Sequence, residues 1–244
     1  MKASLPRIRS RTWIRSTRWA AAAVCAWVLS ASAPALATPT VFGELFGVTG
    51  TPFSFTFVGP GATLSGTTSA LFNFQGLAGA PTGDQAVTVT LTSTAVTPAT
   101  ASGPFLSQPI DGPTNVLKII RTLDSKNILT VGFTGILAGQ AGTPTATLFS
   151  ATSSGNTVAF TSDFLNFSGT PVRTMSLVFP SITPTLSQAG NGFLTNFTSN
   201  AFASFTTDPL PLAVPEPASV GLFGLGLGMA GLVGYRGATR RNRA

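Results

Sequence analysis

The side chains that could carry acid–base chemistry in this 244-residue chain are carboxylates, because no histidine is present. The single cysteine, Cys25, lies near the N-terminus, outside the central part of the chain. Histidine-based catalysis, thiol catalysis and the common zinc sites are therefore excluded for that central part. Its acidic residues are six in number: Glu44, Asp84, Asp111, Asp124, Asp163 and Asp208.

Glycoside hydrolysis is the chemistry that such carboxylates could perform, and it needs two of them facing each other across a cleft. The six acids are scattered, and Asp111 and Asp208 stand beside Gly or Pro residues that favour turns. No Asp-x-Asp loop is present, so Asp84 and Asp111 make poor calcium ligands. We expect no enzymatic activity, metal or cofactor. An enzyme would lose its activity on replacement of one residue among Asp84, Asp111, Asp124 and Asp163.

The positive net charge of +7 is concentrated at the two ends of the chain. Six of the fourteen Lys and Arg residues precede residue 19, and four follow residue 235. Residues 38–214 hold four basic and six acidic side chains, which gives them a net charge of −2. A body of this charge has no basic patch to neutralise phosphates, so nucleic-acid binding is excluded.

The central body, residues 38–206, is predicted to consist of β-strands. Apolar residues alternate with small or hydroxylated ones, most clearly at residues 53–57, 87–92 and 201–205. Gly-, Pro- and Asn-rich breaks separate such runs, and Glu, Lys and Arg, which favour helices, are scarce. We predict an all-β fold, with an antiparallel β-sandwich as the favoured architecture and a β-solenoid as the alternative.

Three local features of the body lead to more specific expectations. Residues 115–133 are predicted to form a hairpin that turns at residues 124–127. Residues 207–213, which include Pro209 and Pro211, are predicted to be an extended linker. Four phenylalanines could line a groove, but core packing is the favoured interpretation: Phe164, Phe167, Phe193 and Phe197.

The N-terminus has the features of a secretory signal peptide. Basic residues without acidic ones precede an apolar run at residues 19–31. Ala35 and Ala37 then supply small side chains at the positions that signal peptidase reads. Cleavage is predicted between Ala37 and Thr38, which makes residues 1–37 the signal peptide. No Arg-Arg pair precedes the apolar run, so the Sec translocon is the expected export route.

The C-terminus carries an uncharged apolar run at residues 218–235. As a helix rising ~1.5 Å per residue it spans roughly 27 Å, close to the hydrocarbon thickness of a bilayer. Pro215 and Pro217 cannot lie inside a helix, so a single transmembrane helix is predicted to begin at or after Pro217. The arginines that follow are expected to remain cytoplasmic and to leave the body on the other side: Arg236, Arg240, Arg241 and Arg243.

Val214, Pro215, Glu216 and Pro217, the apolar run and the arginine-rich tail together resemble the PEP-CTERM sorting signal of Gram-negative bacteria. The resemblance covers residues 214–244, although a Gly-Ala-Thr segment interrupts the basic cluster, where many members have contiguous arginines. It implies recognition by an exosortase, a membrane-embedded transpeptidase-like enzyme that removes the helix and releases or transfers the protein at the cell surface. The alternative is an ordinary tail anchor, which needs no Pro-Glu-Pro motif.

The resemblance also implies an association with biofilm and exopolysaccharide. We therefore expect an exported cell-surface or extracellular-matrix protein with signal peptidase, the Sec translocon, an exosortase and, before processing, the membrane as partners. The competing hypothesis is a carbohydrate-binding module that attaches to exopolysaccharide. Against it, the body contains neither Trp nor Tyr, the side chains on which sugars commonly stack.

Overall fold

The computed structural model describes residues 39–49 and 52–213. The predicted signal peptide, transmembrane helix and sorting motif lie outside these residues. In the part of the chain that is described, no helix has the length and apolar character needed to cross a membrane.

Nearly all regular structure in the described part is extended, apart from one 3-10 turn, η1 (Thr152–Ser154). The strands of the first half are β1 (Thr40–Thr49), β2 (Phe53–Val58), β3 (Gly61–Phe74), β4 (Gln85–Ala95), β5 (Thr100–Ser102), β6 (Phe105–Ile110), β7 (Val116–Arg121) and β8 (Asn127–Phe133). Those of the second half are β9 (Gly135–Gln140), β10 (Ala146–Ala151), β11 (Val158–Thr161), β12 (Leu165–Asn166), β13 (Val172–Phe179), β14 (Phe197–Ser199), β15 (Phe202–Asp208) and β16 (Leu212–Ala213).

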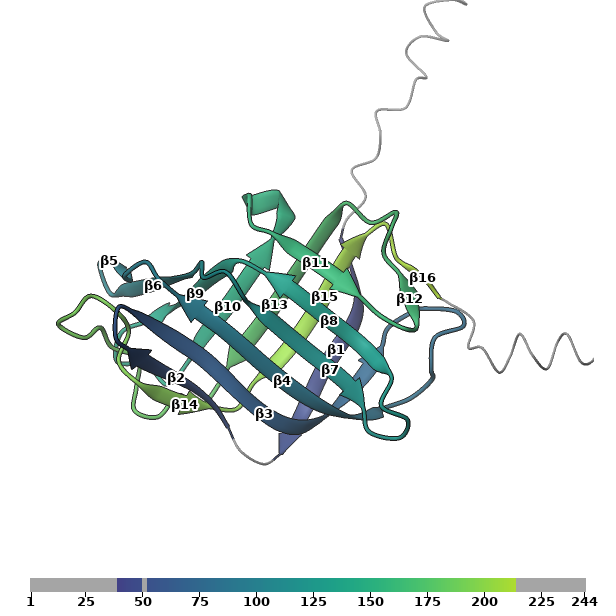
Figure 1. Ribbon diagram of the computed structural model, residues 1–244, viewed down its shortest axis with the longest axis horizontal. Helices are drawn as coiled ribbons and strands as arrows, with labels where there is room; N and C mark the ends of the chain where they lie inside the picture. Colours follow the sequence, from purple (N-terminus) through teal and green to yellow (C-terminus); the bar gives the residue numbers. More distant parts are fainter. Residues whose placement is uncertain (1–38, 50–51, 214–244) are drawn as a thin grey trace, which may run out of the picture. The chain divides into compact units, whose positions relative to one another are not determined.

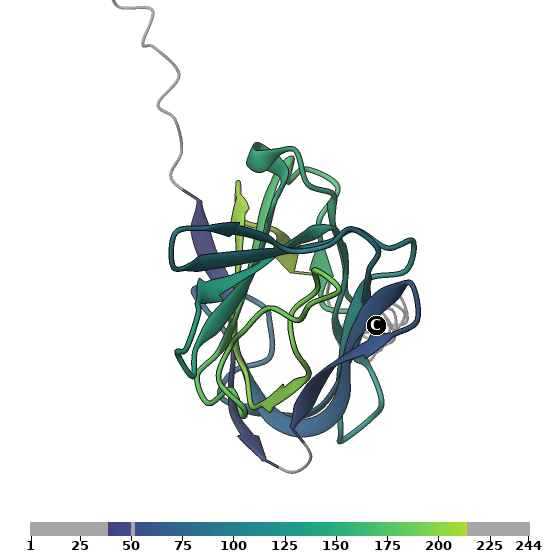
Figure 2. The same ribbon diagram turned by 90° about the vertical axis from the view of Figure 1, so that its left-hand side faces the viewer.

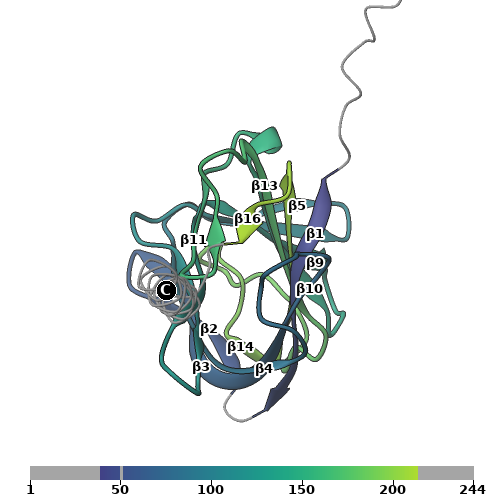
Figure 3. The same ribbon diagram turned by 90° about the vertical axis from the view of Figure 1, so that its right-hand side faces the viewer.

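Fourteen of these strands form one sheet, in the order β11-β8-β7-β4-β3-β1-β15-β13-β10-β9-β6-β5, with β2 and β14 branching from β3. The two remaining strands, β12 and β16, pair with each other. The sheet curls around a common interior, as the end-on views show (Figures 2 and 3). A sheet of this size curls because each strand is rotated relative to its neighbour by the right-handed twist of the chain.

The structure confirms an all-β, antiparallel fold and corrects its architecture. The prediction placed the strands in the two separate sheets of a sandwich, whereas hydrogen bonds connect fourteen of them into one curled sheet. The strand order also differs from the sequential stacking of the β-solenoid alternative. Period-two alternation shows that each strand has a buried face, but it does not show whether facing strands share one sheet.

The predicted hairpin is confirmed, since β7 and β8 pair antiparallel and are joined by residues 122–126 (Figure 1). The segment predicted as a linker at residues 207–213 is more ordered at its two ends than expected. Thr207 and Asp208 complete β15, and Leu212–Ala213 forms β16 against β12. The Pro-rich composition of this segment indicated extended chain but carried no signal for its partners.

The alternating strands place a row of apolar side chains on the inner face of the sheet. Leu45, Ala203, Leu177, Leu148 and Leu137 lie opposite one another across five strands, and all five are buried. Their neighbours along each strand point outward. The inner face therefore supplies the core that the hydrophobic effect requires for stability without a disulfide.

Phenylalanines fill the interior in two groups. Phe42 is fully buried, and its ring centroid lies 5.3 Å from that of Phe167, 5.5 Å from Phe160 and 6.2 Å from Phe205. In the second group, Phe55 stacks on Phe197 at 5.3 Å, and Phe197 meets Phe179 edge-on at 6.3 Å. These offset and edge-on arrangements are the geometries that aromatic rings prefer.

Gly66 lies where β3 changes partners, because Ser65 faces β2 and Ser69 faces β1. A Cβ atom at Gly66 would lie 3.0 Å from the Cα of Phe53 and 2.7 Å from its ring. A glycine therefore allows the close approach of two chains that this changeover requires.

The two ends of the domain lie at the same end of the sheet. Thr40, at the start of β1, is paired with Thr207 near the end of β15. Ala213, the last described residue, belongs to the β12–β16 pair at that same end (Figure 1). The first described strand therefore begins at the end of the domain where the last described strand lies.

Candidate functional site

The described chain reaches the residue immediately before the predicted sorting motif. β16 pairs with β12, with Leu212 opposite Asn166 and Ala213 opposite Leu165. The residues predicted to act in sorting and export lie outside the described part, so the structure does not place them: Val214, Pro215, Glu216, Pro217, Arg236, Arg240, Arg241, Arg243, Ala35, Ala37 and Thr38.

The acidic residues are used in separate local contacts. Asp84 accepts a hydrogen bond from Asn73 Nδ2 at 2.8 Å, and Asp163 accepts one from the backbone N–H of Asn127 at 2.7 Å. Asp111 accepts from the backbone N–H of Val96 at 2.9 Å. Among residues 39–49 and 52–213, no three carboxylates gather into a potential metal site.

Hydrogen bonds also lower the pKa values of two carboxyl groups, those of Asp111 and Asp124. Partial burial raises the pKa of Asp111, but hydrogen bonds from Thr97 and Val96 lower it by more, so the net shift is downward. The Arg121 guanidinium, which bonds both oxygens of Asp124 at 2.8 and 2.5 Å, lowers the pKa of Asp124 to about 2. Both carboxylates therefore remain ionised and serve as hydrogen-bond acceptors in turns.

Arg121 connects this turn to the core. Its guanidinium carbon lies 4.6 Å from the ring centroid of Phe164, which is itself buried. Such a cation–π contact is stabilising when the cation is partly desolvated, as Arg121 is. Phe164, Phe167, Phe193 and Phe197, which could have lined a groove, are all buried, in agreement with the favoured interpretation of core packing.

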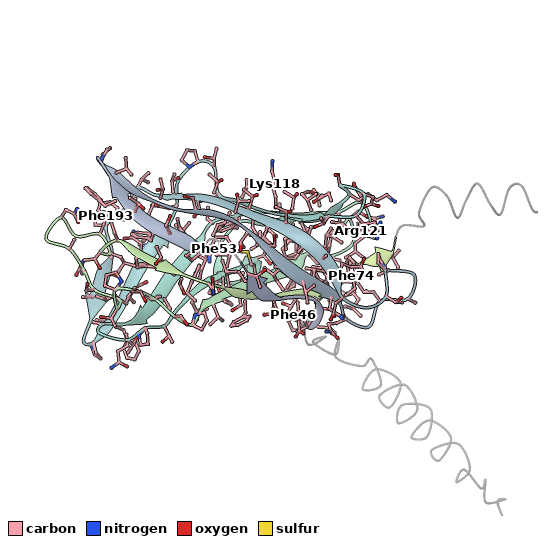
Figure 4. The ribbon with its side chains drawn as sticks, turned by 90° about the horizontal axis from the view of Figure 1, so that it is seen from below. Phe46, Phe53, Phe74, Lys118, Arg121 and Phe193 are labelled. Carbon is pink, nitrogen blue, oxygen red and sulfur yellow. The ribbon has the colours of Figure 1, made fainter. Side chains whose placement is uncertain are left out.

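The outward face of the sheet differs between its two halves. Across β3, β4, β7 and β8, the outward positions in one row are Thr67, Thr90, Lys118 and Thr130. The hydroxyl oxygens of Thr67 and Thr90 lie 3.2 Å apart. Lys118 projects from this side of the molecule, whereas Phe46 lies on the opposite side (Figure 4).

The other half, formed by β1, β15, β13, β10 and β9, exposes large apolar side chains. Phe202 is 46% exposed, Val178 38%, Phe149 42% and Ile136 42%, and Phe46 is half-buried. Phe202 lies opposite Val178, and Phe149 lies opposite Ile136, in two neighbouring rows of the same outer face. Apolar side chains gathered in this way on an exposed face indicate a contact surface.

A groove of about 310 Å³ crosses β1, β15 and β13 within this half. Glu44, Ser204 and Ser176 form one side of it, since Glu44 lies opposite Ser204 and Ser204 opposite Ser176. The carboxylate of Glu44 accepts a hydrogen bond from Gln75 Nε2 at 3.2 Å, which orients it. This side of the groove, called the polar wall below, therefore presents one carboxylate and two hydroxyls.

The opposite side of the same groove is apolar. It is formed by Phe46, Phe202 and Val178, which are called the apolar wall below. Leu45 and Ala203, whose side chains point into the core, lie beneath the groove as its floor. The groove is therefore amphipathic, with both walls running across three neighbouring strands.

Another depression, of about 350 Å³, lies beside β12 and includes Asn166, Phe167 and Arg173 among its lining residues. The Arg173 guanidinium donates to the carbonyl oxygens of Phe167 at 2.7 Å and Thr170 at 2.8 Å. Because these bonds fix the loop before β13, Arg173 has a structural role here.

Sequence reasoning missed the residues of the amphipathic groove, although one signal was available. Phe202 and Phe205 are three positions apart, so they must point to opposite faces of a strand. Since Phe205 is buried, Phe202 had to face outward. The cross-strand partners that complete the groove come from β1 and β13 and could not be found by local pattern.

The model of the PEP-CTERM protein-sorting motif matches residues 213–241. The C-terminus of the chain is therefore a PEP-CTERM sorting domain. This motif indicates a protein that is sorted by an exosortase, and such sorting implies export and targeting to the cell surface. Comparison with curated proteins and with solved structures gives no match.

Proposed function

We propose that this chain is an exported cell-surface or extracellular-matrix protein whose β-domain is released from a transient membrane anchor by an exosortase. The observation that carries the proposal is the direct connection of the domain to the sorting domain. The last paired residue of β16, Ala213, is also the first residue matched by the sorting motif.

The arrangement of the chain ends supports anchoring before processing. Thr40 and Thr207 are paired, so the segments that lead to the apolar run at 19–31 and to that at 218–235 continue from one end of the domain. A domain held by that end presents the outer face of its sheet to the surroundings. Cutting near Pro217 frees it.

The domain acts without catalysis in this proposal. Its carboxylates at Asp84, Asp111, Asp124 and Asp163 serve as hydrogen-bond acceptors for neighbouring turns and strands. Glycoside hydrolysis needs two carboxylates that face each other. Carboxylates that each serve a different local contact do not support such a mechanism. The function then depends on what the outer surface binds, in the setting of biofilm and exopolysaccharide that the sorting signal implies.

Expression of the full chain together with an exosortase tests the proposal. Replacement of Pro215, Glu216 and Pro217 by alanine should retain the protein in the membrane fraction, whereas the wild-type chain is released. Pro60→Ala, which changes an exposed turn between β2 and β3, is the matched control and should be released normally. Equal release of the motif variant would contradict the proposal.

Attachment to polysaccharide is the second candidate function, and the amphipathic groove favours it. A surface protein that works only as a passive structural element has no need for a groove that combines a carboxylate, two hydroxyls and two phenyl rings.

A further inference from the structure

We propose that the amphipathic groove across β1, β15 and β13 binds a neutral, extended β-linked polysaccharide. The inference rests on the proposed function in one respect, namely that the domain meets its ligand outside the cell. The site itself is defined by the polar wall of Glu44, Ser204 and Ser176 and the apolar wall of Phe46, Phe202 and Val178.

The chemistry of the two walls matches that of a pyranose ring. A sugar ring in an equatorial arrangement presents C–H groups on its faces and hydroxyls around its rim. The phenyl rings of Phe46 and Phe202 offer an apolar surface for the C–H face, and the polar wall offers partners for the rim. Ligand sites commonly combine a mainly apolar lining with a few oriented polar groups in this way.

The polar wall can both donate and accept hydrogen bonds. The Glu44 carboxylate accepts only, while the hydroxyls of Ser204 and Ser176 donate and accept. Glu44 receives one bond from Gln75 through Oε2, which orients the carboxylate without engaging both of its oxygens. A sugar hydroxyl that donates to Glu44 makes a charge-assisted bond, which is stronger than a bond between neutral groups.

The size and direction of the groove favour an extended chain over a single compact ligand. Neighbouring strands are about 4.8 Å apart, so the walls offer equivalent positions at an interval close to one sugar unit of an extended β-linked glycan. The volume of about 310 Å³ is at the lower end of ligand sites, which span about 300–1,000 Å³. Phe149 on β10 and Ile136 on β9 continue the row of the polar wall beyond the groove, because Phe149 lies opposite Ser176. Both side chains are exposed, so that row ends in apolar groups.

The charge at the groove selects against acidic polysaccharides. Glu44 is the charged residue among those that line it, and no Lys or Arg of the described chain is among them. A uronate carboxylate would have to approach Glu44 without a cation to compensate the repulsion. A neutral glycan avoids this cost.

A second copy of the chain is a weaker candidate for the same surface. The exposed apolar side chains share two rows across five strands with Glu44, Ser204 and Ser176, and the two rows together cover roughly 300 Å² at the spacings of a β-sheet. A stable protein interface buries about 800 Å² per partner. The apolar surface is therefore too small to hold a dimer by itself, whereas it is sufficient for a few sugar units.

Titration of the full chain with cellohexaose and chitohexaose tests the inference. The chain is kept in a zwitterionic detergent without a sugar headgroup, so that binding is measured whether or not an exosortase processes it. We expect both neutral oligosaccharides to bind and oligogalacturonate, which carries carboxylates, to bind at least about tenfold more weakly. If the chain binds the neutral oligosaccharides but is not processed by an exosortase in cells, the proposed function is contradicted and the binding site is still supported.

Variants locate the binding to the groove. Phe202→Ala should weaken binding by about tenfold or more, as expected for removal of a central aromatic contact, and Glu44→Gln should reduce the discrimination against oligogalacturonate. Phe105→Ala is the matched control, because Phe105 is 60% exposed on β6 but does not line the groove.

Three results would overturn the inference. The first is the absence of binding to either neutral oligosaccharide by a chain with the circular dichroism of a folded β-protein. The second is equal loss of binding in Phe105→Ala and Phe202→Ala. The third is concentration-dependent dimerisation that Phe202→Ala abolishes, which would assign the surface to a second copy.

Discussion

Leu165 lies opposite Ala213 in the two-residue ladder between β12 and β16, and Ala213 is the residue at which the sorting domain begins. From Ala213 to Ala218, where the apolar run begins, an extended chain of five residues spans at most about 18 Å. From Asp208, the end of β15, ten residues span about 36 Å. In the anchored state that we propose, release of β16 would therefore double the length of extended chain between the folded domain and the apolar run.

Locking β16 to β12 is expected to slow exosortase processing, because the cleavage motif then stays close to the folded domain. Asn166→Cys with Leu212→Cys introduces cysteines at directly opposed positions, where antiparallel strands come close enough for a disulfide. We predict that the oxidised variant accumulates in the membrane fraction and that reduction restores release. The measurement is a time course of release into the medium.

A cross-link elsewhere in the sheet provides the control for this experiment. Thr67→Cys with Thr90→Cys joins two opposed outward positions of β3 and β4, which pair with neither β12 nor β16. Its release should match that of the wild-type chain. Identical release of the β12–β16 variant under oxidising conditions would show that detachment of β16 is not needed.

Phe205 and Phe202 allow a comparison of the same substitution on the two faces of β15. Phe205→Ala removes a fully buried ring that neighbours Phe42, Phe72 and Phe160, so it should lower the free energy of unfolding by about 3–5 kcal/mol. Phe202→Ala changes an exposed side chain and should alter it by no more than about 0.5 kcal/mol. Urea unfolding followed by circular dichroism measures both, and similar losses would contradict the assignment of the two faces.

The ion pair of Arg121 with Asp124 predicts a dependence of stability on acid. The pKa of Asp124 is lowered from 3.8 to about 2 in the folded chain, so the folded state binds fewer protons than the unfolded state between these values. The contribution of this carboxylate is therefore fully present above about pH 4 and is lost as the pH falls through about 2.

Asp124→Asn should accordingly lower stability at neutral pH and make stability less sensitive to pH between 4 and 2 than in the wild type. Thermal unfolding at a series of pH values measures this. Asp208→Asn is the control, because it also replaces one carboxylate by an amide but leaves the Arg121–Asp124 contact in place. If stability changes with pH between 4 and 2 equally in Asp124→Asn and in the wild type, the Arg121–Asp124 contact is not the cause of that change.

Gly66→Ala should destabilise the fold through a clash with backbone, because the added Cβ would lie 3.0 Å from the Cα of Phe53. Gly132→Ala is the control in another strand, where an added Cβ meets no atom within 4 Å. We predict a lower midpoint of urea unfolding for Gly66→Ala alone, measured by circular dichroism. Equal midpoints of urea unfolding for the two variants would contradict a tight contact between Gly66 of β3 and Phe53 of β2.

Local pattern was sufficient to predict the strands but not their partners. The alternation at residues 201–205 correctly indicated a strand, and the turn at residues 124–127 correctly indicated the β7–β8 hairpin. The pairing of Phe205 with Gly43 joins the two ends of the domain, and no local signal predicts it. For this reason a single curled sheet could not be distinguished from two stacked ones.

The same limit explains why the sorting signal could be predicted from the sequence, whereas the groove could not. Val214, Pro215, Glu216 and Pro217 are contiguous, so their spacing is visible in the chain itself. Glu44, Ser204 and Ser176 become neighbours only when β1, β15 and β13 pair. A site built across strands requires the register, which depends on the whole fold.

Mass spectrometry of the mature protein, recovered from cells that contain an exosortase, tests directly whether the chain is processed at its C-terminus. We predict a mature chain that begins at Thr38 and ends close to Pro217, without the apolar run and the arginine-rich tail. A mature protein that still contains Arg243 would contradict processing by an exosortase.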